Sequence, residues 1–220
     1  MSTLYTNARF WSAGQEIFHD LLVKDSIILA TGEQTKEFTA ETTIDLNGAF
    51  VIPAFLDGHA HPIFAGREAA GPKINGINSI EEIKAQVKAF AQANPTTPWI
   101  IGGAYEAAII EGGDFDATWL DEVVSDRPVV LHAVDHHTIW VNSKAIEVAG
   151  ITSATKDPQG GTIARNSDGS AKGTLREPSA MALVLNHAPA NTIESDIAAI
   201  TYACAEYRKV GVIAAIDSWC

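Results

Sequence analysis

A short apolar run that ends in two closely spaced histidines constrains the fold of this chain more than any other feature. The run covers residues 49–56 and leads into Asp57, His59 and His61. Residues two apart on a β-strand project to the same face, so the two imidazoles can share one metal ion. Pro62 follows and, because it lacks an N–H donor, ends strand pairing. An apolar strand with this ending is typical of the carboxyl end of a strand in a parallel β/α barrel, where such enzymes carry their chemistry.

Composition narrows the class of protein. The chain has 220 residues, 46% of them hydrophobic, which is enough to bury a core in one or two globular domains. A formal net charge of −12 repels phosphate backbones and anionic lipid, so we expect neither nucleic acid nor a membrane as a partner. No signal peptide is visible and no apolar run approaches the roughly 20 residues of a membrane span, which predicts a soluble, cytoplasmic protein. Cys204 and Cys220 form neither a disulfide framework nor a paired-cysteine zinc site, which leaves histidine and carboxylate as metal ligands.

The pattern changes near residue 50. Residues 1–50 read as short strands separated by turns, the clearest of them at Asn47-Gly48, and predict an N-terminal β-module. Residues 51–220 alternate strands with helices, which favours a parallel sheet. The most distinct helix, 79–93, begins with a capping box formed by Ser79 and Glu82. The other predicted elements of this region are strands at 99–103, 129–134 and 212–217, helices opening near Thr118, Asn142, Pro178 and Asn191 (the last with Glu194 as its capping partner), and a hairpin within 160–177.

The number of strands limits the architecture. A closed β/α barrel has eight strands in about 250 residues. Only three or four parallel candidates are found here, so we expect an incomplete barrel.

Further candidate site residues follow the predicted strands. Asp135, His136 and His137 come directly after the strand that contains His132. Adjacent side chains of an extended chain point to opposite sides, so only one of His136 and His137 is expected to face the mouth of the barrel. For each of these histidines a hydrogen-bonded structural role is favoured over direct metal ligation, and for His19 and His187 it is favoured more strongly still.

Two carboxylates end strands in the same way. Glu177 either bridges two cations or acts as a general base, or it is a first-turn glutamate that complements the helix dipole. Asp217 lies at the end of the last strand, and its position favours a functional role. Neutral imidazoles and carboxylates suit Zn²⁺ and similar ions, which lower the pKa of bound water towards roughly 7. A catalytic site usually has three protein ligands, of which His59 and His61 are two.

Residues 45–61 resemble the strand-one signature of the amidohydrolase superfamily. Later blocks are similar to amidohydrolase family 3, the YtcJ-like group, and occur in the family's order: 119–121, 126–129, 135–137, 140–145, 149–151, 157–161 and 173–177. The resemblance implies an α/β fold, a partial (β/α) TIM-like barrel preceded by a small β-sandwich module to which residues 1–50 belong.

The resemblance also implies a function. The family's metal-binding pair falls on His59 and His61, its active-site histidine on His137, and its strand-end carboxylate on Glu177, as a bridging ligand or base. The expected activity is hydrolysis of a carbon–nitrogen bond in a small-molecule, non-peptide amide by metal-activated water, with His137 polarising the carbonyl. The implied cofactor is one or two divalent ions, zinc in the first place.

Two departures from the family pattern matter. Ala54 stands where the family usually has glycine, which adds strain if that position needs a positive φ. Family members are longer, and their later strands bring further histidines and an aspartate to the metal, so we expect an N-terminal portion that is inactive alone. The alternative is a non-catalytic split or relic homologue that acts as a subunit or binding module and completes its barrel with another chain or a second copy.

Overall fold

The structure, a computed structural model, describes residues 1–14 and 17–218, so Cys220 lies outside the described part. The chain divides into two compact units. The first comprises residues 1–58 and 210–215, and the second comprises residues 59–209 and the stretch from residue 216 onward. Within the described residues, no helix combines the length and the apolar character that a membrane crossing requires.

The first unit is built on a four-stranded sheet with the order β4-β3-β1-β5, in which β1 runs antiparallel to β3 and parallel to β5. A second, two-stranded sheet pairs β2 with β6 in parallel. Nδ1 of His19 donates a 2.7 Å hydrogen bond to the carbonyl oxygen of Ala8, in agreement with the structural role expected for it. The elements are β1 (Ser2–Thr6), β2 (Arg9–Phe10), β3 (Leu21–Lys24), β4 (Ile27–Thr31), the 3-10 helix η1 (Gly32–Glu37), β5 (Thr42–Asp45) and β6 (Phe50–Val51).

The predicted strand at 49–56 is broken in the structure. β6 ends at Val51, and β7 (Phe55–Ala60) begins after Pro53, which has no N–H for a sheet ladder. β7 pairs with β13 (Val212–Asp217). The amide of Phe55 bonds the carbonyl of Gly211 and the amide of Ser218 bonds the carbonyl of Ala60, so the two strands run in the same direction.

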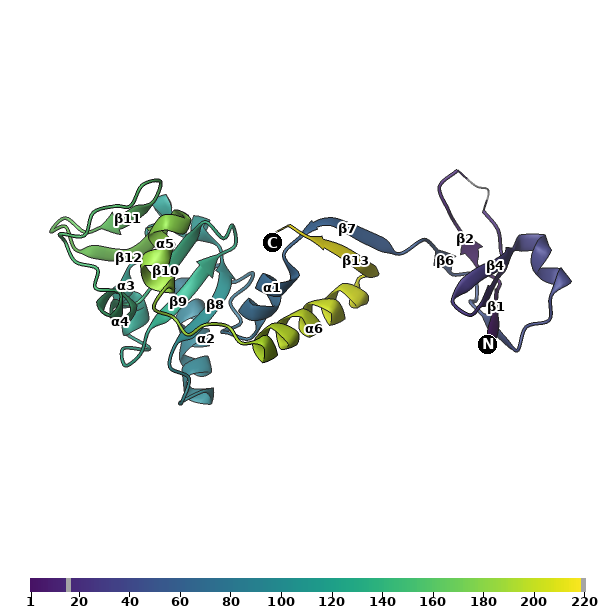
Figure 1. The fold of residues 1–220 in the computed structure, drawn as a ribbon, viewed down its shortest axis with the longest axis horizontal. Helices are drawn as coiled ribbons and strands as arrows, with labels where there is room; N and C mark the ends of the chain where they lie inside the picture. Colours follow the sequence, from purple (N-terminus) through teal and green to yellow (C-terminus); the bar gives the residue numbers. More distant parts are fainter. Residues whose placement is uncertain (15–16, 219–220) are drawn as a thin grey trace. The chain divides into compact units, whose positions relative to one another are not determined.

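A five-stranded sheet forms the centre of the second unit, with the order β11-β12-β10-β9-β8 (Figure 1). β8 and β9 are parallel, as predicted, and β11 and β12 form the hairpin predicted within 160–177, but β10 runs antiparallel to both β9 and β12, so the prediction of a parallel sheet is wrong at β10. The reason is the turn 134–137, which is far too short for the crossover that a parallel connection needs. The strands are β8 (Ile100–Tyr105), β9 (Val129–Ala133), β10 (Thr138–Val141), β11 (Thr162–Arg165) and β12 (Ala171–Arg176).

Helices cover both faces of this sheet. Val129 and Leu131 of β9 belong to one buried cluster with residues of α2 and α3, whereas Val130 belongs to another with residues of α4 and α5. This division follows from the alternation of side chains along a strand. Figure 1 shows α5 lying across β10 and β12. The helices are α1 (Pro62–Ala69), α2 (Ile80–Ala93), α3 (Ala117–Asp121), α4 (Ser143–Val148), α5 (Glu177–Leu185) and α6 (Ile193–Lys209), with 3-10 turns η2 (Ala107–Ile109) and η3 (Glu111–Gly113).

Two helix caps predicted from the sequence can be compared with the structure. Ser79 Oγ accepts a 3.4 Å hydrogen bond from the amide of Glu82, which confirms the predicted cap of α2. For α6 the predicted partners are wrong by one position. Thr192 and Ser195 exchange the reciprocal bonds instead, because the hydroxyl of each accepts from the backbone amide of the other.

Candidate active site

His59 and His61 lie at the junction of β7 and α1. His59 is on the strand, but His61 lies just beyond it and is the N-cap of α1, with Pro62 as the first helical residue. Their rings meet edge to face with centroids 5.3 Å apart. His61 Nδ1 lies 3.9 Å from Oδ1 of Asp217, the last residue of β13. The ends of β7 and β13 and the start of α1 therefore place His61 near both His59 and Asp217.

These donors match a divalent metal ion in kind but not in number. Imidazole nitrogen and carboxylate oxygen are ligands that zinc accepts, and a catalytic zinc usually takes three from the protein. Within the residues that the structure describes, no three histidine, cysteine or acidic side chains are grouped closely enough to hold an ion. The residues therefore fit part of a metal site.

His137 and Glu177 form a second pair. Nδ1 of His137 donates to Oε2 of Glu177 at 3.1 Å, and the backbone amide of Glu177 donates to the carbonyl of His137 at 2.7 Å. The antiparallel register of β10 and β12, in which Thr138 lies opposite Arg176, places the two residues beside each other. The carboxylate raises the pKa of His137 above its ordinary value, first through the hydrogen bond and then through its charge.

Two residues of this region have left-handed backbone. His136 has φ of +59° and Glu177 has φ of +67°, a conformation that costs a non-glycine residue about 1 kcal/mol or more. A 2.9 Å hydrogen bond from the amide of His137 to Oδ1 of Asp135 closes the turn around His136. Such backbone is concentrated at functional sites.

The same turn corrects the expectation that only one of His136 and His137 faces the site. Both line one cavity of about 550 Å³, because the chain between β9 and β10 is a tight turn and not an extended strand. His61 lines this cavity too. Its other lining residues are Phe64, His132, Val134, Asp135, Pro178, Met181, Ala182, Leu185 and Asn186.

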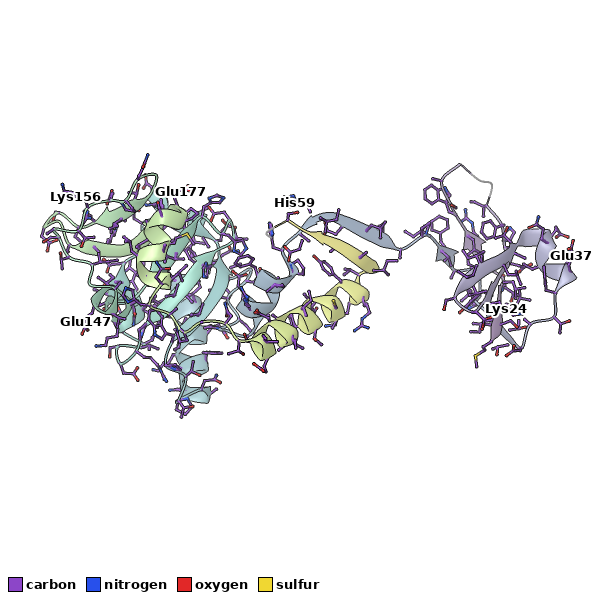
Figure 2. The ribbon with its side chains drawn as sticks, viewed as in Figure 1. Lys24, Glu37, His59, Glu147, Lys156 and Glu177 are labelled. Carbon is purple, nitrogen blue, oxygen red and sulfur yellow. The ribbon has the colours of Figure 1, made fainter. Side chains whose placement is uncertain are left out.

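Glu177 and His59 come from different parts of the second unit. Figure 2 shows Glu177 at the start of α5 and His59 at the end of β7. In the described structure the carboxylate of Glu177 bonds His137, which is compatible with an acid–base role; its predicted role as a metal ligand stays a prediction.

Sequence reasoning missed two residues of α1. The ring of Phe64 lies between His61 and His136, with centroid distances of 6.4 and 5.7 Å. Glu68 Oε1 lies 3.5 Å from Nδ1 of His136. Phe64 and Glu68 are four residues apart and share a helix face. Reading Pro62 as the first residue of a helix would have revealed both.

The sequence of the chain is similar to a protein family and to several known proteins. The profile of a family described as "Amidohydrolase family" matches residues 42–220. "Protein LONG AFTER FAR-RED 3" of Arabidopsis thaliana is 33% identical over 187 residues, which are 82% of this chain and 32% of that protein. "Putative amidohydrolase YtcJ" of Bacillus subtilis (strain 168) is 35% identical over 173 residues, 76% of this chain and 32% of that protein. The matched region thus spans 32% of the length of each of these two curated relatives.

A solved structure has a similar fold. The crystal structure of an uncharacterized metal-dependent hydrolase from Pyrococcus furiosus aligns with a TM-score of 0.65 and 21% identity, over 98% of this chain and 44% of the other. At this identity the likeness concerns the fold.

Proposed function

The chain belongs to the amidohydrolase family, and from this premise we propose that it forms part of the active site of a metal-dependent hydrolase that cleaves carbon–nitrogen bonds in small-molecule amides. One observation carries the proposal. The cavity of about 550 Å³ is lined both by His61, a member of the metal-type histidine pair, and by His137, a member of the acid–base pair. A volume of this size is ordinary for a small-molecule site.

The roles follow from the chemistry of each group. His59 and His61 hold a divalent ion, zinc in the first place, with Asp217 within reach of His61. The bound ion would supply a water of lowered pKa and a positive charge for the substrate carbonyl. His137, whose pKa Glu177 raises, donates a proton or a hydrogen bond to the carbonyl oxygen or the leaving nitrogen. Glu177 keeps that imidazole oriented and, as the base, would accept the proton that the attacking water releases and pass it to His137, which delivers it to the leaving nitrogen; alternatively it contributes to the ion as the resemblance implies.

We further propose that the described residues belong to one part of a TIM-like barrel and supply only some of the ion's ligands. Among the described residues too few side chains converge for a catalytic zinc site, so the remaining ligands would come from additional residues, in a longer chain or in a partner subunit. A non-catalytic subunit that contributes His59 and His61 to a shared site is the second candidate, and the same shortage of ligands favours it.

Zinc titration tests the histidine pair. Isothermal titration of the metal-free chain with Zn²⁺ should give one binding event in the native sequence, weakened at least tenfold in both His59→Asn and His61→Asn. His187→Asn is the matched control, because His187 is exposed on the segment after α5 and should leave binding unchanged. Equal affinity in all four proteins would remove the pair from the metal site.

Hydrolysis of formanilide and acetanilide, followed by release of aniline, tests the activity. We expect no turnover above that of free Zn²⁺ for this chain alone. Turnover by the zinc-loaded chain, lost in His59→Asn, would show that the described residues suffice and would overturn the proposal of missing ligands.

A further inference from the structure

Glu68 of α1 carries a carboxyl group that the proposed chemistry does not use. Its side chain is only 15% exposed and lies against the backbone of β8, where Gly103 leaves room for it. A Cβ at Gly103 would collide with the carboxyl oxygen and carbon of Glu68. The packing of α1 on β8 therefore accommodates a buried acid at this point (Figure 1).

Among the described residues, no lysine or arginine forms an ion pair with this acid, although Lys73 lines a second cavity that Glu68 also borders. Nδ1 of His136 lies 3.5 Å from Oε1 of Glu68, and Oε1 forms no hydrogen bond there. Arg67 is the next residue along the helix, but its guanidinium binds Asp196 at 2.9 and 2.7 Å. Burial alone raises the pKa of Glu68 to about 7, which agrees with the absence of a cation beside it.

The carboxyl borders a cavity of about 450 Å³. Phe64, Ile101 and Leu185 give this cavity apolar walls, and His132 adds an imidazole. Burial, and then the nearby His136, lowers the pKa of His132 to about 4, so that His132 is neutral at pH 7. The cavity therefore combines apolar surface with one acid, and Arg67, a cation that also lines it, is paired with Asp196.

We propose that Glu68 binds an ammonium group of the amide substrate, whose apolar part packs against Phe64, Ile101 and Leu185. An ammonium has three donors and satisfies a buried carboxylate, with a charge-assisted bond stronger than a neutral one. Phe64 also contacts His61, so the cavity adjoins the proposed reaction site. This inference rests on the proposed function. It names the class of substrate: an amide that carries a primary amine and an apolar group.

Binding of benzylammonium to the full chain tests the proposal. Benzyl alcohol is the neutral probe of similar shape, and excess EDTA removes any metal that an amine would ligate. In ¹H–¹⁵N spectra at pH 7.5, benzylammonium should shift the imidazole signals of His132 and His136 and leave those of His19 and His187 unchanged. It should bind at least tenfold more tightly than benzyl alcohol.

Two variants, one at Glu68 and one at an exposed glutamate, test whether the carboxyl of Glu68 itself binds the ammonium group. Glu68→Gln should weaken benzylammonium binding at least tenfold and leave benzyl alcohol binding unchanged. Glu147→Gln removes an exposed glutamate of α4 (Figure 2) and should change neither. Circular dichroism verifies folding of both; if Glu68→Gln does not fold, the two probes are compared on the native chain alone.

Equal binding of benzylammonium and benzyl alcohol to the native chain, or full binding by folded Glu68→Gln, would overturn the proposal. The benzylammonium experiment contains no metal, so its result is independent of the zinc titration. If the native chain binds benzylammonium but not zinc, the metal site is refuted and the ammonium site remains.

Discussion

At the scale of single residues, the bond between His137 and Glu177 sets the protonation of the imidazole. The carboxylate stabilises the charged ring, so the pKa of His137 is raised and the ring stays protonated to higher pH. Glu177→Gln removes the charge and keeps the shape. We expect the pKa of His137 to fall towards the ordinary value near 6.5 in an NMR titration with EDTA present. The chemical shifts of a histidine outside the pair serve as the internal control, and an unchanged pKa of His137 would show that the pair does not form in solution.

Glu68 predicts a dependence of stability on pH. Its folded pKa of about 7 lies above the ordinary 4.5, so the folded state holds the proton more tightly than the unfolded state. Stability contributed by the neutral acid is present below pH 4.5 and is lost as pH rises through 7. The shift corresponds to about 3 kcal/mol.

Comparing the pH dependence of stability in the native chain and in Glu68→Gln isolates the contribution of the Glu68 carboxyl. His132 and His136 face Glu68, and their lowered pKa values act in the opposite sense, because they favour unfolding as pH falls. Both histidines remain in the variant, so their effect largely cancels in the difference. Urea unfolding from pH 4.5 to 8 should show the variant gaining about 3 kcal/mol relative to the native chain. A difference that is constant across this range would contradict a raised pKa.

Sequence reasoning at this scale succeeds where the signal is local. His59 and His61 are placed together because they are two residues apart next to a strand end. Glu68 and His136 are 68 positions apart in sequence, and their contact depends on how α1 packs on β8. No spacing rule predicts such a contact.

At the scale of elements, Asn142 connects a strand to a helix and a turn. The side chain is fully buried and makes four hydrogen bonds. Its Oδ1 accepts from the amides of Val129 and Ala145 at 2.9 and 3.0 Å, and its Nδ2 donates to the carbonyls of Val124 and Arg127 at 2.9 Å each. It is thus the N-cap of α4 and also a link between β9 and the segment after α3.

Replacement of Asn142 by alanine should leave these buried backbone groups without partners. We expect a loss of roughly 3–4 kcal/mol in the free energy of unfolding by urea. Asn186→Ala, at the exposed C-cap of α5, should change it by less than about 0.5 kcal/mol. A loss below 1 kcal/mol for Asn142→Ala would mean that water replaces the side chain at this site.

Helices and strands that are marked by local features of their own sequence, such as a cap or regular apolar spacing, were predicted well. α2 has its cap and its apolar spacing within one segment, and the predicted strand 212–217 matches β13. β10 was missed because Thr138–Val141 is short and buried throughout, so it shows no alternation of polar and apolar residues. The mixed direction of the sheet follows from this missing strand.

At the scale of the whole molecule, the ordered blocks of residues 45–177 predicted the family, which the comparisons confirmed. Single motifs were less informative, since two histidines alone fit several kinds of site. The architecture is harder to predict, because a mixed sheet and a separate strand pair arise from long-range pairing, which block order does not specify.

The net charge of −12 is a property of the whole chain with its own consequence. Like charges repel one another in the folded state more than in the expanded chain, and salt screens the repulsion as the Debye length falls from about 30 Å at 0.01 M to about 8 Å at 0.15 M. If screening raises the free energy of unfolding by about 1 kcal/mol, Tm should rise by roughly 2–4 °C between these two salt concentrations. Sodium chloride and choline chloride should act equally in thermal unfolding with EDTA present, because screening depends on ionic strength and not on the ion. A Tm that falls with salt would instead show that ion pairs such as Arg67–Asp196 contribute more to the stability than the excess negative charge removes.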